Sequence, residues 1–184
     1  ARGMLGMIKA AAALKTDRWG ERLAQCLLAN MRITSRLGFS PERIDGPLTP
    51  DHWRGRFDSR FTLFDPHHQA YLQACYLWAY RQTGDRLFHD RAKSAIRLTM
   101  EAYPDRWSWT NGQITLQRAR FILPLAWLVR VEDTPEHRAW LDRMVKELLT
   151  DQVECGAIRT RIVHSPTSNE AYGTGETALV DQNG

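Results

Sequence analysis

The sequence lacks an apolar run long enough to span a bilayer, because Lys9, Lys15 and Arg18 interrupt even its alanine-rich start. A membrane-spanning helix needs about 20 consecutive apolar residues. The N-terminal part also lacks a short apolar core followed by a cleavage site, so no export signal is predicted within this chain. We therefore expect no membrane partner, and the cellular location stays open.

Lysine is scarce, since only Lys9, Lys15, Lys93 and Lys146 occur among the 25 basic residues. The net charge of +4 therefore rests on arginines, which are scattered singly between aspartates and glutamates. A nucleic-acid surface needs a basic stripe on one face. Because the sequence has no such stripe, we expect no nucleic-acid partner.

Cysteine is rare as well, and the wide spacing of Cys26, Cys75 and Cys155 argues against a zinc site or a disulfide framework. Cys26 and Cys75 stand among Leu, Ala and Tyr at helical spacing, so both are predicted to be small buried residues. We expect neither a metal nor a cofactor.

The sequence does contain helical periodicity throughout, and it predicts an all-α fold. Its 184 residues, 43% hydrophobic and 25% charged, are typical of one domain covering 1–184. Apolar positions such as Leu72, Tyr76 and Tyr80 follow the period of 3.6 residues. Only 152–163, rich in Val, Ile and Thr, is predicted to be extended. Helices are predicted at 4–16, 18–37, 66–82, 86–102, 114–131 and 135–150, with Pro124 kinking or splitting the fifth near Leu123.

The helices are predicted to form three copies of one antiparallel hairpin. A shift of 49 positions places Arg81 on Arg130, and Gly84-Asp85 supplies a turn and a capping carboxylate between two helices. Thr134 is a second predicted cap, followed by Pro135 at a first helical position. The same shift matches Ile96 with Val145 and Met100 with Leu149, and a shift of 68 positions the other way matches Asp85-Arg86 with Asp17-Arg18.

The connections alternate in length, and this alternation predicts where function lies. Turns within hairpins are short, whereas the connections 38–65, 103–113 and 151–184 are long. Consecutive antiparallel helices place all short turns at one end and all long loops at the other. Long loops in a compact domain are usually functional or disordered, so the long-loop end is the predicted active face.

The long loops carry aromatic rings, carboxylates and amides, which are the groups that a sugar-binding cleft needs. Rings cover the apolar faces of a pyranose, and paired acids cleave glycosidic bonds. The candidate catalytic residues are Asp65, Glu170, Glu176 and Asp181, and the candidate substrate-binding residues are His67, His68, Trp107, Trp109, Gln113 and Tyr172.

Several candidates have a structural alternative. Asp65 precedes Pro66 and is typical of a helix cap before it is a catalytic acid. His67 and His68 point about 100° apart on a helix, so they do not suit one metal. Cys155, beside Glu154, is either a nucleophile or, preferably, a buried structural residue. Trp107 and Trp109 either bind sugar or fill the core beneath a loop.

The segment Trp78–Asp85 resembles the hairpin signature of the six-hairpin glycosidase-like superfamily, the (α/α)6 toroids. The stretches 154–159, 168–177 and 181–184 look like bacterial members of unassigned activity. The resemblance implies an inner ring formed by helices 4–16, 66–82 and 114–131, with a cleft at their N-terminal ends. Six helices are about half of such a ring, so we expect an arc that is a fragment of a longer toroid, or that pairs with a second copy.

These observations predict a carbohydrate-active enzyme with a carbohydrate substrate, most simply a glycoside hydrolase that uses paired carboxylates. A polysaccharide lyase is the nearest variant. The alternative is a non-catalytic, solenoid-like module that binds a partner on its concave face. A cleft with converging carboxylates would favour the enzyme, and a smooth apolar groove would favour the module.

The segment from about Ser165 to Gly184 has no helical stripe, but it holds four of the candidate site residues. We expect it to fold across the long-loop end, with Glu170 or Glu176 near Asp65 or the Trp107 loop.

Overall fold

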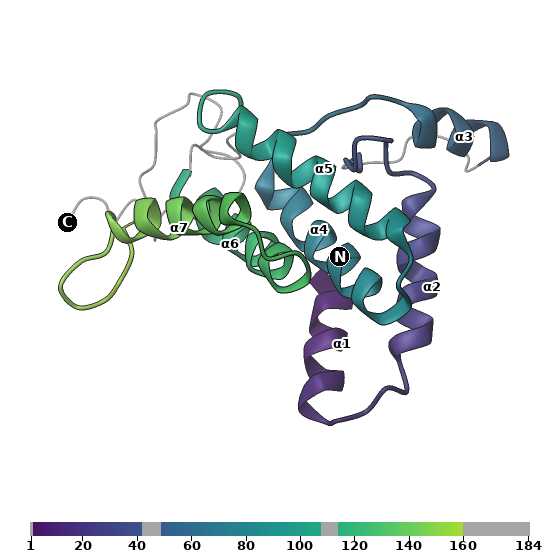
Figure 1. The fold of residues 1–184 in the computed structure, drawn as a ribbon, viewed down its shortest axis with the longest axis horizontal. Helices are drawn as coiled ribbons and strands as arrows, with labels where there is room; N and C mark the ends of the chain where they lie inside the picture. Colours follow the sequence, from purple (N-terminus) through teal and green to yellow (C-terminus); the bar gives the residue numbers. More distant parts are fainter. Residues whose placement is uncertain (1, 42–48, 108–113, 160–184) are drawn as a thin grey trace, which may run out of the picture.

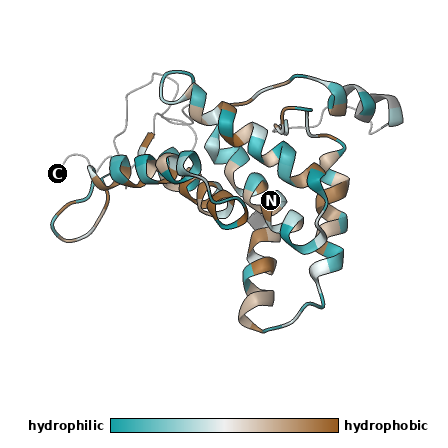
Figure 2. Cartoon of the chain, in the orientation of Figure 1, coloured by the Kyte–Doolittle hydropathy of each residue, from teal (hydrophilic) through white to brown (hydrophobic). Residues whose placement is uncertain are grey.

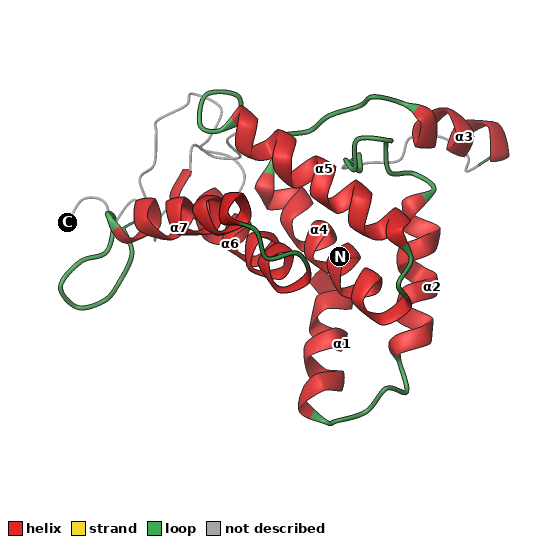
Figure 3. Cartoon of the chain, viewed as in Figure 1, coloured by secondary structure: helices red, strands yellow, loops and turns green. Residues whose placement is uncertain are grey.

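The chain is all-α in the computed structural model, which describes residues 2–41, 49–107 and 114–159 (Figures 1 and 3). The sequence predicts that the segment 152–163 is extended. In its described part, up to residue 159, the β-pairing consists of one isolated antiparallel bridge between Gln152 and Ile158. The helices are α1 (Arg2–Ala13), α2 (Gly20–Met31), α3 (Pro50–Asp58), α4 (Pro66–Thr83), α5 (Arg86–Ala102), α6 (Ile114–Val131) and α7 (Pro135–Leu149).

Local capping signals set the helix starts that the sequence predicts. The side chains of Asp65, Asp85 and Thr134 accept backbone N–H bonds at the starts of α4, α5 and α7. Pro66 and Pro135 occupy first-turn positions, where a missing N–H costs nothing. Gly84 ends α4 with a φ of 72°, a left-handed conformation that favours glycine. These caps confirm the predicted turns.

The structure corrects two of the predicted segments, and it excludes the split that was one of the two alternatives for Pro124. Helix 18–37 is shorter, because α2 ends at Met31 and the chain turns at Ser35–Gly38, where Ser35 N–H donates to Phe39 O. The expected loop 38–65 contains α3, whose nine residues carry too few apolar positions to form a periodic stripe. Pro124 does not split α6, which continues to Val131 packed between α4 and α7.

Helices α4 and α6 lie side by side and run in the same direction. Near their N-terminal ends, the Gln117 side-chain amide donates to Asp65 Oδ1 at 3.1 Å. The short turns that follow them also meet, because His89 and Lys93 near the start of α5 contact Glu132 after α6, at 3.1 and 2.7 Å. Short turns therefore share one end, as the alternating connections predict. The arc and the ring stay predictions.

Helix α4 is the centre of the core. Eleven of its residues are buried, and buried side chains of α1, α2, α5 and α6 belong to the same apolar cluster. On α5 the buried positions Phe88, Ala92, Ile96 and Met100 form one stripe, and hydrophilic residues alternate with hydrophobic ones along that helix (Figure 2). Amphipathic helices thus surround a helix that is covered on nearly every side.

Polar groups tie α4 to the segment around the end of α2. Tyr76 is fully buried, and its hydroxyl donates to Asn30 Oδ1 at 2.8 Å and lies 2.7 Å from Thr34 Oγ1. Burial raises the pKa of Tyr76 well above its usual value, so the neutral phenol is retained. About two turns earlier on α4, Gln69 exchanges two hydrogen bonds with the Ser40 backbone, at 3.1 and 2.8 Å.

Within the described residues, no helix has both the length and the apolar character required to cross a membrane.

Gly38 and Gly84 both have a positive φ, but only at Gly38 would an added side chain also overlap with neighbouring atoms. A Cβ at Gly38 would lie 1.9 Å from the carbonyl oxygen of Arg91, whereas a Cβ at Gly84 would meet nothing within 4 Å. Gly84→Ala should cost about 1–2 kcal/mol from the left-handed conformation alone. Gly38→Ala should cost about 3 kcal/mol or more, because α5 must also move. Urea unfolding followed by circular dichroism measures both; equal losses would contradict the close packing of Gly38 on α5.

Candidate functional site

Asp65 lies at the end of the molecule where the sequence places the active face, but its first role is structural. The carboxylate is buried, with 2% of the residue exposed. Oδ1 accepts the His67 N–H at 2.8 Å and the Gln117 side-chain amide at 3.1 Å, and Oδ2 lies 2.9 Å from His68 Nδ1. Both carboxylate oxygens are therefore engaged, and the prediction that Asp65 caps a helix is confirmed. A substrate would meet His68 before it met Asp65.

His68 is the more accessible member of this pair. Its side chain is 35% exposed, against 3% for that of Asp65. The bond from Nδ1 to a buried carboxylate orients the ring, as in catalytic sites where a carboxylate holds an imidazole. His67 is half-buried, and its ring centroid is 4.7 Å from that of His68. The two adjacent histidines share one surface without forming a metal site.

Trp107 packs in the core, which is the structural alternative to a sugar platform. It is 2% exposed, and its indole N–H donates to Thr99 O at 2.7 Å. Its ring contacts Tyr103 and Phe121 at centroid distances of 4.6 and 5.3 Å. The ring face is therefore covered and presents no surface to a sugar in this conformation.

Six other candidates fall on residues outside the described part of the chain. They are Trp109, Gln113, Glu170, Tyr172, Glu176 and Asp181. The expected position of 165–184 across the long-loop end lies outside the described residues as well.

A charged network that the sequence analysis did not identify lies at the same end, around the start of α6. Arg118 Nε donates to the Tyr103 hydroxyl at 2.7 Å, and its Nη2 lies 3.1 Å from Glu147 at the end of α7. Tyr103 donates in turn to Glu147. Burial and the Glu147 bond raise the pKa of Tyr103 to about 12, so the phenol stays protonated at neutral pH. No sequence spacing joins these three residues, because they come from the end of α5, from α6 and from α7.

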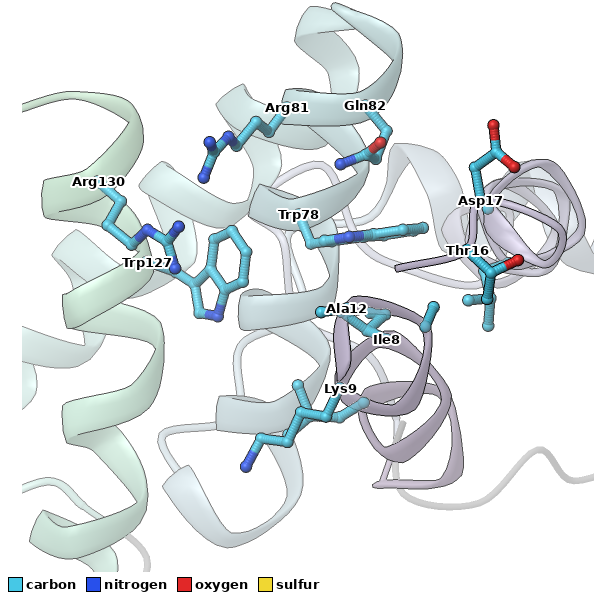
Figure 4. Close-up of a pocket in the computed structure, with 14 residues that line it drawn as sticks. Ile8, Lys9, Ala12, Thr16, Asp17, Trp78, Arg81, Gln82, Trp127 and Arg130 are labelled. Carbon is cyan, nitrogen blue, oxygen red and sulfur yellow. The ribbon is translucent and has the colours of Figure 1, made fainter. Parts of the chain in front are cut away.

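A cavity lies at the opposite end, where the short turns are. It has a volume of about 520 Å³ and lies between α1, α4 and α6 (Figure 4). Trp78, Arg81 and Gln82 line it from α4, and Trp127 and Arg130 from α6. Its remaining lining residues are Leu5, Ile8, Lys9, Ala11, Ala12, Thr16, Asp17, Gly20 and Leu23. The loop lengths predict function only at the other end.

A sequence signal for this cavity was present. The 49-residue shift that relates Arg81 to Arg130 also relates Trp78 to Trp127, so the pattern Trp-x-x-Arg occurs twice. A spacing of three residues places both side chains on one helix face. Because α4 and α6 are parallel neighbours, the two copies face one cavity (Figure 4).

The cysteine predictions are partly wrong. Cys75 is buried, and burial raises its pKa to about 11, but Cys26 and Cys155 are exposed. Cys26 lies on the side of α2 away from Leu23 and Leu27, which supply the buried face. Cys155 follows α7 in an open turn. Among the described residues, no group of three or more His, Cys, Asp or Glu side chains is arranged to hold a metal.

The thiols give a direct test of this burial pattern. In the native chain, Cys26 and Cys155 should react with a disulfide reagent within minutes, whereas Cys75 should react only after unfolding, because its thiolate is suppressed and covered. A Cys26→Ser/Cys155→Ser variant should show no fast reaction. A fast-reacting third thiol would contradict the burial of Cys75.

Two capping aspartates test what Asp65 does beyond capping. Asp85→Ala removes one exposed cap and should cost about 1 kcal/mol. Asp65→Ala also removes the partner of Gln117 and His68 and should cost about 3 kcal/mol. Chemical denaturation of both variants measures the difference. Similar losses would mean that the contact between α4 and α6 through Gln117 contributes nothing.

Comparisons of this chain with protein-family models, with curated proteins and with solved structures found no match.

Proposed function

We propose that this chain is part of a carbohydrate-active enzyme that cleaves glycosidic bonds, and that cleavage takes place at the end where α4 and α6 begin. The observation that carries the proposal is the pair formed by His68 and Asp65, with Nδ1 and Oδ2 2.9 Å apart. The carbohydrate class comes from the resemblance of the hairpin segment Trp78–Asp85 to toroidal glycosidases.

The pair supports proton transfer by His68. A partly exposed imidazole can reach a substrate, and the buried carboxylate fixes its tautomer and stabilises the imidazolium that forms when the ring takes a proton. Nε2 lies on the far side of the ring from Asp65, so it is the atom that would exchange a proton with the sugar. Asp65 is a positioning residue in this scheme.

Hydrolysis is the first form of the reaction. It needs one group that protonates the leaving oxygen and another that activates water or attacks the anomeric carbon. In this scheme His68 supplies one of them, and Glu170, Glu176 and Asp181 are the predicted sources of the other. The expected substrate contacts of His67, Gln113 and Tyr172 belong to the same end.

Elimination is the second candidate, and the presence of a histidine where a free carboxylate was expected favours it. On a uronate, a base removes the proton beside the carboxylate carbon, the bond to the leaving oxygen breaks, and a carbon–carbon double bond forms. The leaving oxygen then takes a proton. This route needs no pair of carboxylates. His68 would be the base.

The test is a screen of the chain on neutral and uronate polysaccharides, with separate readouts for new reducing ends and for the ultraviolet absorbance of an unsaturated product. Where product forms, His68→Asn should lower kcat about 100-fold or more, with the fold intact by circular dichroism. Asp65→Asn keeps a capping oxygen, so it should lower kcat and shift the pH profile while leaving the helix start in place.

The matched control is Arg97→Gln, because Arg97 lies on the exposed side of α5 beside Glu101 and contacts neither histidine. Unsaturated product would assign elimination, and reducing ends without it would assign hydrolysis. Product formation that is unchanged in His68→Asn would overturn the role of this pair. Failure to cleave or bind any glycan would overturn the enzyme proposal.

A further inference from the structure

The cavity at the short-turn end has an excess of positive charge. Lys9, Arg81 and Arg130 line it, against the single carboxylate of Asp17, which leaves a net charge of +2. Across the described residues, none of these three cations forms an ion pair or a side-chain hydrogen bond with another residue. Arg118, near the start of α6, lies instead 3.1 Å from Glu147 and 3.7 Å from Asp151.

Helix dipoles do not cancel this charge. The cavity lies at the C-terminal ends of α1, α4 and α6, where partial negative charge accumulates. However, the short turns bring the N-terminal ends of α2, α5 and α7 to the same end of each hairpin, and their partial positive charge offsets it. The side-chain charges therefore determine the sign of the potential.

Aromatic rings supply the rest of the lining. Trp78 is 8% exposed and Trp127 is half-buried, and both line the cavity, from α4 and α6 (Figure 4). The Arg130 guanidinium lies 4.7 Å from the Trp127 ring centroid, and the Arg81 side chain extends toward the same ring (Figure 4). The cavity lining thus combines the flat face of the Trp127 ring with the guanidinium groups of Arg81 and Arg130.

We propose that this cavity binds a carboxylate carried on a ring with a flat, apolar face. The ring would lie against the two indoles, and the carboxylate would accept hydrogen bonds from Arg81 and Arg130, whose planar groups match a carboxylate in shape and charge. Lys9 adds charge at the α1 side, and the Gln82 amide can bond a ring hydroxyl. The volume of about 520 Å³ suits a ligand of one or two rings.

Two sources carry this chemistry, namely an acidic sugar and an aromatic acid. Digalacturonate and benzoate are the probes, and the methyl ester of digalacturonate and benzyl alcohol are their uncharged counterparts. Binding to the intact chain is measured by calorimetry and by tryptophan fluorescence. We expect at least one acid to bind, its uncharged counterpart to bind about tenfold more weakly or not at all, and affinity to fall as salt rises.

Variants assign the binding to this cavity. Arg81→Gln/Arg130→Gln and Trp127→Leu should each weaken binding about tenfold. Arg97→Gln and Trp140→Leu are controls, because Arg97 and Trp140 lie on α5 and α7 and do not line the cavity. Each arginine also stabilises the last turn of its helix; that role alone would lower the melting temperature of the free chain and leave affinity per folded molecule unchanged.

Binding of digalacturonate alone assigns an acidic sugar, and binding of benzoate alone assigns an aromatic acid. Absence of binding by both acids, equal binding of the uncharged counterparts, or equal losses in the control variants would overturn the proposal. It does not rest on cleavage at the other end, so His68→Asn should bind with unchanged affinity.

Discussion

The burial of α4 on nearly every side is the constraint on which the rest of this structure depends. A helix covered in this way gains apolar contacts with α1, α2, α5 and α6, but each of its polar groups then needs a partner inside the protein. Asp65, Gln69 and Tyr76 find theirs in segments 29 to 52 residues distant in sequence. Those hydrogen bonds fix which neighbour lies against which turn of α4. Packing alone would allow the outer helices to slide.

The two ends of α4 differ in chemistry because they differ in connection. At the first end the helix begins from a buried carboxylate, and polar side chains gather around it from the starts of α4 and α6. At the second end the helix closes in a turn of a few residues, and large side chains of its last turns line the cavity that lies there. Tryptophan and arginine serve that purpose because both combine a flat apolar surface with a polar edge.

Local chemistry was predictable from the sequence, and long-range contact was not. Gly84, Asp85 and Thr134 act within one turn of the chain, so their residue types alone predict the helix boundaries. Cys75 is buried because α4 is covered on nearly every side, whereas Cys26 is exposed because other positions of α2 face the core. Both cysteines have apolar neighbours in sequence, so the sequence does not distinguish them.

The same limit applies to the candidate sites. Asp65 was identified correctly as a cap, because the Asp-Pro pair is a local signal. Its partner Gln117 lies 52 residues away and could not be identified without the fold. The cavity was missed for a different reason. Its repeated Trp-x-x-Arg pattern is visible in the sequence, but the lengths of the loops predict a functional site at the other end of the hairpins.

Helix α1 differs from its neighbours in how it is attached. Among the described residues, no side-chain hydrogen bond or ion pair joins α1 to another helix, and its contribution to the core consists of apolar side chains such as Leu5 and Ile8. Such contacts can separate without leaving a buried polar group unsatisfied. Since α1 forms one wall of the cavity, that wall is held in place, within the described part of the chain, by apolar packing alone, whereas the α4 and α6 walls belong to helices that are also joined by hydrogen bonds.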